Sequence, residues 1–169
     1  MLSIGIIGGK EVYRTREMLC ELYSLNPQFA KNENVNVYAF DILSDSAIAL
    51  PSHLDLLVIS GSEGLKDFMN MGISFKQAIV NSDIKDIYKH LKGFEGSIIS
   101  YGLNGKACVT ASSIMEGNAV FSIQRAIETL NGKTLMQQDF PVKIEFSSEE
   151  LDSLLGAVTT AITQGLDIV

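Results

Sequence analysis

The sequence predicts an α/β protein with a three-layer, P-loop-like, mainly parallel sheet that carries helices on both faces. Strand-like and helix-like segments alternate as far as Gly93, which is the pattern of parallel α/β folds. Residues 54–60 (LDLLVIS) are almost continuously apolar, as in a strand covered on both faces. After residue 95, short alternating segments separated by Asn-Gly pairs predict an additional antiparallel β layer in the C-terminal half.

Composition limits the classes of function. The chain has 169 residues, of which 46% are hydrophobic, and this favours one domain over residues 1–169 with a substantial core. The net charge is −7 and Lys and Arg do not cluster, so we expect neither a nucleic-acid partner nor a membrane partner. No apolar run approaches the ~20 residues that span a bilayer.

Cysteine and histidine usage gives no indication of a metal site. Cys20, Cys108, His53 and His90 lie far apart, without a metal-ligand spacing, so we expect reduced thiols and no metal. Residues 1–7 lack a basic leader and resemble a first strand, so we expect a cytoplasmic location. No Ser-His-Asp or Cys-His pattern is present, and we expect no catalytic group.

The opening stretch, residues 2–22, predicts a strand, a Gly8-Gly9 turn and a helix. The apolar helix positions recur every three or four residues: Val12, Thr15, Leu19 and Leu22. Parallel α/β folds use this arrangement to present backbone N–H groups to a phosphate. The G-x-x-x-x-G-K-[ST] pattern is absent, however, because Lys10 is followed by Glu11 and the glycine spacing does not fit.

The remaining elements follow in order. In the first half we expect strands at 35–40, 54–60 and 77–81, a short helix capped by Ser62, and a helix capped by Ser82 or Asp83 that ends at Gly93. In the second half we expect strands at 96–103 and 106–114 joined by an Asn104-Gly105 hairpin, then strands at 119–129 and 134–146, and a last helix from 151 to Gly165. Pro141 should lie at a sheet edge or bulge, and Ser147 with Glu150 forms a capping box.

Several segments share their order with one known family. They are QAIVNSD (77–83), ISYGL (99–103), the strand at 107–114, FSI (121–123) and LLGAVTTAITQGL (154–166). Together they resemble the central, ATP-binding domain of the Mur ligases, with its "vvNaDD" strand end, its "tyG" strand and its alanine-rich helix. Residues 4–19 also align without a gap with the family's IGITGTNGKTTTxxML stretch, and the resemblance covers nearly the whole chain.

The departures from the family pattern fall on the phosphate-handling positions. In this register Glu11 replaces the second P-loop glycine and Val12 replaces the lysine. Tyr13 and Arg14 replace the hydroxyl residues, and Gly64-Leu65 stands where the family carries Asp-His. A carboxylate ~4–6 Å from the phosphates is unfavourable by on the order of 1–3 kcal/mol at intermediate dielectric. The family's ligases also carry a nucleotide-sugar domain and a closing C-terminal domain, for which we find no counterpart here.

The resemblance therefore implies a vestigial nucleotide site. The expected ligand-binding residues are Gly8, Gly9, Lys10, Arg14, Ser60, Ser62, Glu63 and Asn81. The simpler interpretation of Lys10 and Arg14 is a solvated helix face, that of residues 60–63 is an ordinary strand-to-helix turn, and that of Asp83 is a helix cap.

Three hypotheses follow. The first is a degenerate, stand-alone, non-catalytic relative that binds a small ligand or a protein partner and uses no cofactor. The second is a component of a split, ATP-dependent, amide-bond-forming ligase of the Mur type, which would need ATP, Mg²⁺ and a partner protein. The third is a homo-oligomer that uses the surface left uncovered by the missing domains.

Overall fold

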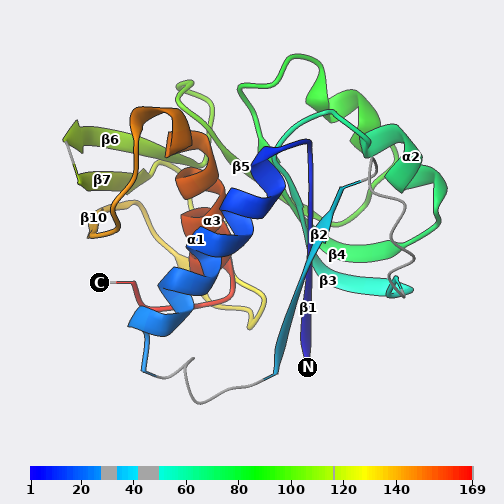
Figure 1. The fold of residues 1–169 in the computed structure, drawn as a ribbon, viewed down its shortest axis with the longest axis horizontal. Helices are drawn as coiled ribbons and strands as arrows, with labels where there is room; N and C mark the ends of the chain where they lie inside the picture. Colours follow the sequence, from blue (N-terminus) through cyan, green and yellow to red (C-terminus); the bar gives the residue numbers. More distant parts are fainter. Residues whose placement is uncertain (28–33, 42–49, 116, 169) are drawn as a thin grey trace.

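The computed structural model describes residues 1–27, 34–41, 50–115 and 117–168. Within these residues an eight-stranded sheet has the order β10-β7-β6-β5-β4-β3-β1-β2 (Figure 1). The strands of its parallel part are β1 (Leu2–Ile7), β2 (Val35–Phe40), β3 (His53–Ile59), β4 (Ser74–Asn81) and β5 (Ser97–Tyr101). The strands that follow are β6 (Val109–Met115), β7 (Asn118–Ile123) and β10 (Gln138–Val142), and β8 (Ile127–Glu128) pairs separately with β9 (Thr134–Leu135).

Helices cover both faces of the parallel part, as the sequence predicts. Helix α1 (Glu11–Leu25) and helix α3 (Leu151–Thr163) lie side by side on one face (Figure 1). The short helix α2 (Leu65–Asn70) and the 3₁₀ turn η1 (Ile87–Leu91) cover the other face. Each face therefore has its own apolar core, and the predicted α/β class with its antiparallel C-terminal strands is confirmed.

The two long helices bury different amounts of surface. Helix α1 buries the stripe predicted from its spacing, including Val12, Thr15 and Leu19. Every residue of α3 except Asp152 is buried. Its three threonines are tolerated there because each hydroxyl donates to the backbone carbonyl four residues earlier, at 2.7 Å. The capping box of Ser147 and Glu150 precedes α3 in the 3₁₀ turn η2 (Ser148–Glu150), as predicted.

The predicted Asn104-Gly105 hairpin is wrong. Strands β5 and β6 run parallel and pair only where Tyr101 meets Val109. The hairpin turn favoured by Asn-Gly needs a positive φ at both central residues, and neither Asn104 nor Gly105 has one. Instead the Asp83 carboxylate accepts hydrogen bonds from the N–H groups of Leu103 (2.6 Å) and Asn104 (3.1 Å), which turns this loop back over the edge of the sheet.

Other boundaries shift as well. Asp83 holds this loop instead of capping a helix, and the expected helix before Gly93 is only the 3₁₀ turn η1, with Tyr88 exposed. The N-cap residue of α2 is Gly64, so Ser62 does not cap this helix. The expected strand at 134–146 divides into β9 and β10, and the expected strand at 119–129 divides into β7 and β8. Pro141 lies in β10 at the edge of the sheet, as expected.

Candidate functional site

The candidate site lies where the parallel strands end. At this edge the turn after β1 and the turn after β3 are in backbone contact. Gly8 has a φ of +133°, and a Cβ added to it would lie 2.0 Å from the backbone N of Gly61. The Ser60 N–H and hydroxyl both donate to the carbonyl of Ile7, at 2.8 and 2.9 Å. Only glycine fits at Gly8, and the two turns hold each other in place.

Two carboxylates lie close to Gly9, in the turn between β1 and α1. A Cβ added to Gly9 would lie 2.6 Å from Oε2 of Glu63 and 3.4 Å from Oε2 of Glu11. Lys10 has αR backbone angles at the N-cap position of α1, makes no side-chain cap and is exposed, and it forms no ion pair with any described residue. The turn before α1 therefore presents negative charge where phosphate-binding turns present free N–H groups.

Arg14 is engaged away from this turn. Its Nε donates to Oε1 of Glu150 at 2.6 Å, and its Nη1 lies 3.2 Å from Glu17 and 3.6 Å from Glu21. Burial disfavours the charged form, but the hydrogen bonds to Glu150 and Glu17 outweigh this effect and raise the pKa of Arg14. The guanidinium thus joins α1 to the start of α3.

Of the other predicted residues, Asn81 is the one most constrained by its neighbours. It is 1% exposed; its Nδ2 donates to the Ser60 carbonyl at 3.5 Å and its Oδ1 accepts from the N–H of Asp83 at 3.1 Å. Asn81 therefore ties the end of β4 to the end of β3. Ser62 and Glu63 are exposed at the same edge. The structure brings Gly8, Gly9, Ser60, Ser62, Glu63 and Asn81 together and places Arg14 to one side.

Sequence reasoning missed two residues of this edge, Tyr101 and Asp152. Tyr101 is fully buried and its hydroxyl has no hydrogen-bond partner within the described residues; the same is true of the Thr15 hydroxyl. Burial raises the pKa of Tyr101, and the charges of Asp152, Asp83 and Glu11 raise it further. Burial also raises the pKa of Asp152, and the negative charges of Asp83 and Glu11 raise it further. The acidic groups that raise these two pKa values come from α1, from α3 and from the turn after β4.

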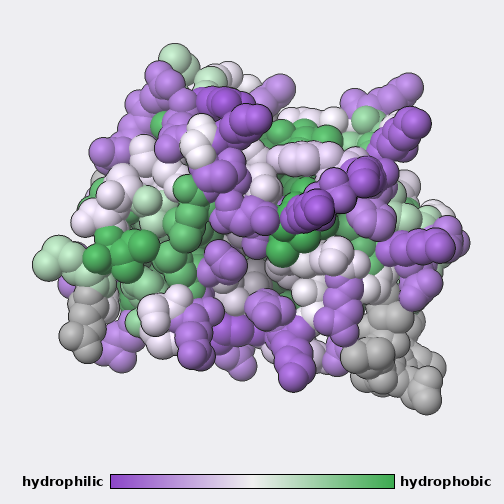
Figure 2. Space-filling view, turned by 90° about the horizontal axis from the view of Figure 1, so that it is seen from above, coloured by the Kyte–Doolittle hydropathy of each residue, from purple (hydrophilic) through white to green (hydrophobic). Residues whose placement is uncertain are grey.

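Several carboxylates belong to this edge. Its carboxylates come from four separate segments: Glu11, Glu63, Asp83 and Asp152. None of them forms an ion pair with any residue that the structure describes. Figure 2, which views the molecule from the side on which β1 ends, shows hydrophilic residues across the middle of this face. No group of three or more His, Cys, Asp or Glu side chains in the described ranges is arranged to hold a metal ion.

Comparison with known proteins gives a likeness in structure but none in sequence. No family model matches the chain, and no curated protein matches it by sequence. A crystal structure of MurF ligase from Thermotoga maritima in complex with ADP is similar, with a TM-score of 0.60 over 99% of this chain at 15% identity. The chain has a Mur-ligase-like fold. It spans 46% of the length of that ligase.

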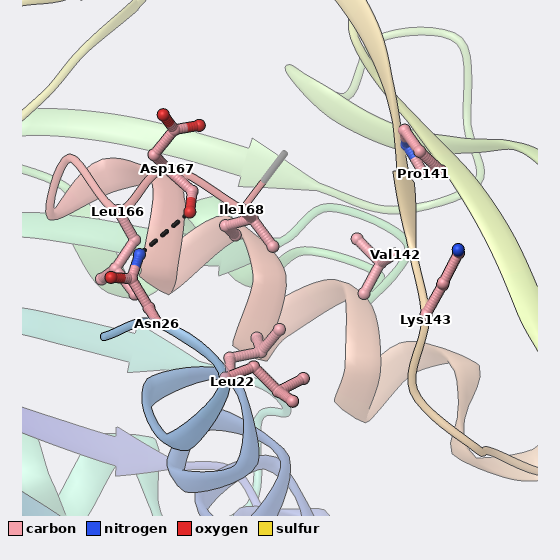
Figure 3. Close-up of a pocket in the computed structure, with 9 residues that line it drawn as sticks. Leu22, Asn26, Pro141, Val142, Lys143, Leu166, Asp167 and Ile168 are labelled. Carbon is pink, nitrogen blue, oxygen red and sulfur yellow. Dashed lines mark hydrogen bonds between the residues drawn. The ribbon is translucent and has the colours of Figure 1, made fainter. Parts of the chain in front are cut away.

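The chain also has concave surface away from its carboxylate edge. A cavity of about 340 Å³ lies between the C-terminal end of α1, β10 and the segment after α3 (Figure 3). Its apolar walls include Leu22, Val142 and Ile168, and Asn26 Nδ2 closes one side by donating to the Asp167 carbonyl at 2.9 Å. The described residues that line this cavity include no cluster of polar groups suited to chemistry, so we assign the candidate site to the carboxylate edge. In the described part of the chain, no helix is long and apolar enough to cross a membrane.

Proposed function

We propose that this chain, which has a Mur-ligase-like fold, is a non-catalytic domain that no longer binds nucleoside triphosphates. It acts by binding a small ligand or a protein partner. The observation that carries the proposal is the pair of carboxylates, Glu63 and Glu11, over Gly9. A carboxylate about 4–6 Å from a phosphate is unfavourable by on the order of 1–3 kcal/mol at intermediate dielectric. Repulsion of this size lowers the affinity for a polyphosphate by about five- to a hundredfold for each carboxylate.

The positive groups nearby do not offset this repulsion. Arg14 is held by Glu150, and Val12, at the lysine position of the family pattern, is fully buried. Lys10 is exposed to solvent, and an ion pair between an exposed ammonium and a phosphate contributes little. We therefore expect no cofactor and no ATP-driven chemistry.

Calorimetric titration with Mg-ATP and with ADP tests the proposal. We expect no saturable binding up to millimolar nucleotide. The double variant Glu11→Gln/Glu63→Gln should bind Mg-ATP more tightly than the wild type does. Glu128→Gln, which removes a carboxylate from strand β8, should leave the affinity for Mg-ATP unchanged. Micromolar binding of Mg-ATP by the wild type would refute the proposal.

A second candidate function is a component of a split, ATP-dependent, amide-bond-forming ligase. It is favoured by the comparison itself, because the structure that the chain resembles is that of a MurF ligase in complex with ADP. This function requires a partner polypeptide that supplies the groups for ATP and Mg²⁺. It predicts co-purification with that partner and amide formation from a carboxylate and an amine only in the mixture. Mixtures that bind each other but never consume ATP would exclude it.

The proposed setting is the cytoplasm of a bacterium. Cys20 and Cys108 are both unpaired, which favours a reducing compartment, and bacterial origin rests on the likeness to the Thermotoga maritima ligase.

We further propose that the chain associates with itself. Light scattering that shows only a monomer at tens of micromolar would remove that part of the proposal.

A further inference from the structure

The apolar cavity of Figure 3 lies far from the carboxylate edge. Helix α1 begins at that edge with Glu11 and ends beside the cavity with Leu25, so about 20 Å of helix, at about 1.5 Å per residue, separates the two places. The cavity volume of about 340 Å³ falls within the range of small-molecule sites, which is about 300–1,000 Å³. A ligand bound here would leave the turn before α1 free.

The cavity walls are aliphatic. Leu22 and Leu25 come from α1, Val142 comes from β10, and Leu166 and Ile168 come from the segment after α3. The described residues that line the cavity include no aromatic side chain, so a flat ring system would find no stacking partner there. A flexible alkyl chain can fill the space between branched aliphatic side chains, and each methylene group that leaves water raises the affinity about fourfold.

The wall after α3 is held in place by hydrogen bonds. The N–H of Leu166 donates to the carbonyl of Ala161 at 3.1 Å, and Asn26 Nδ2 donates to the carbonyl of Asp167 at 2.9 Å (Figure 3). Leu22 and Leu166 are buried, whereas Leu25 is 65% exposed. The inner walls are therefore formed before a ligand arrives, and an entering alkyl chain would cover the exposed Leu25.

The charge beside the cavity is that of Lys143. This residue follows β10, is exposed, and forms no ion pair within the part of the chain that the structure describes. Asp167 also borders the cavity, but its carboxylate is directed away from Leu22 and Val142 (Figure 3). An ammonium binds a carboxylate through a charge-assisted hydrogen bond of about 2.7–2.9 Å. The aliphatic walls thus supply affinity, and Lys143 supplies orientation.

We propose that this cavity binds an aliphatic carboxylate of medium chain length, with its alkyl chain against Leu22, Leu25, Val142 and Ile168 and its carboxylate at Lys143. The site goes beyond the proposed function, because it shares no residue with the carboxylate edge. The far end of the alkyl chain is limited by residues 166–168, which also line a second cavity of about 300 Å³ on their other side.

Calorimetric titration of the intact chain with sodium octanoate at physiological ionic strength tests the proposal. We expect saturable, one-to-one binding at millimolar concentration or below. Butanoate should bind at least about a hundredfold more weakly, because it buries four methylene groups fewer at about fourfold each. Octanamide should bind about three- to fivefold more weakly, as expected for the loss of one exposed ion pair. The absence of saturable octanoate binding would overturn the proposal, and equal affinities for octanoate and octanamide would overturn the carboxylate class.

Two pairs of variants place the ligand. Leu25→Ser should weaken octanoate binding about tenfold, whereas Leu103→Ser, which removes another exposed leucine (53%) beside Asp83, should leave the affinity unchanged. Equal weakening in both variants would show detergent-like association and overturn the site. Lys143→Met should abolish the preference for octanoate over octanamide, and Lys66→Met, which removes an exposed lysine from α2, should retain it. Loss of the preference in both would reduce Lys143 to an effect of net charge.

The shared wall gives a test of chain length. Ile168→Ala should open a passage toward the second cavity, so the affinity for dodecanoate relative to octanoate should rise severalfold over the wild-type ratio. An unchanged ratio would overturn the placement of the chain end. Mg-ATP binding is a separate measurement: a chain that binds no octanoate leaves the loss of triphosphate binding standing, and micromolar Mg-ATP binding leaves the carboxylate site standing.

Discussion

Replacing Gly156 by alanine measures how closely α3 packs on Tyr101. Alanine at a helix interior gains about 1 kcal/mol over glycine in propensity. The added methyl would lie 3.0 Å from Tyr101 Oη and 3.2 Å from its Cζ, however, and Tyr101 is fully buried at the end of a central strand. Overpacking of this kind is unfavourable by about 1–3 kcal/mol. We expect Gly156→Ala alone to lower the free energy of unfolding by about 0–2 kcal/mol.

The same change in the Tyr101→Phe background isolates the hydroxyl. Without Oη the nearest contact is the ring carbon, so the helix propensity of alanine should offset most of the remaining strain. We expect a coupling free energy of about 1 kcal/mol between the two positions. Urea unfolding of the wild type, both single variants and the double variant at pH 7 measures it, provided that the m-values agree. Equal effects of Gly156→Ala in the two backgrounds would show that the hydroxyl is not the limiting contact.

Three further changes test other parts of the structure. Gly61→Ala places a methyl 2.4 Å from the carbonyl oxygen of Gly8, so we expect a loss of about 3 kcal/mol in urea unfolding; an unchanged midpoint would contradict the contact. The pKa of Glu150 is lowered by the N–H of Ser147 and by its arginine partner, so its stabilisation is present above its unfolded pKa of about 4.3 and is lost as the pH falls through the folded value. Glu150→Gln should therefore lower the melting temperature at pH 7 but not at pH 2. The pKa of Asp152 is raised instead, so its charge destabilises the fold above the folded pKa; Asp152→Asn should raise the melting temperature at pH 7, and a gain that persists at pH 3 would refute the cause assigned here.

Local sequence predicts the parallel half of this fold well. The apolar run at 54–60 favours a strand that is buried on both faces, and it forms β3 as expected; β3 lies between β1 and β4 in the sheet. The apolar positions from Val12 to Leu22 recur every three or four residues, which is the period of an α-helix, and α1 buries them. In both cases the pattern and the burial are set by the same few residues.

The failures arise where a distant residue decides the local structure. Asn104-Gly105 favours a hairpin on its own, but the carboxylate of Asp83, some twenty residues earlier, holds the N–H groups of that loop. The partner of Arg14 is likewise Glu150, 136 residues away. No local spacing signals such contacts.

The candidate site was predictable in part for the same reason. Gly8, Ser60 and Asn81 follow strands that sequence identifies, and strand ends share one edge of a parallel sheet. Asp152 reaches this edge from the last helix, so its position depends on how α3 packs. Tyr101 looks like an ordinary core residue in the sequence, and only the structure shows that its hydroxyl lacks a partner among the described residues.

The placement of α3 has a consequence for synthesis in the cell. This helix covers the centre of the sheet and packs along α1, yet its first residue, Leu151, leaves the ribosome after every strand has been made. Until then the apolar side of the nascent chain that includes Ile4, Val58 and Ile79 has no cover from α3. The protein must therefore complete its main core after translation of residue 163, and chaperones that shield apolar surface would act on it during that interval.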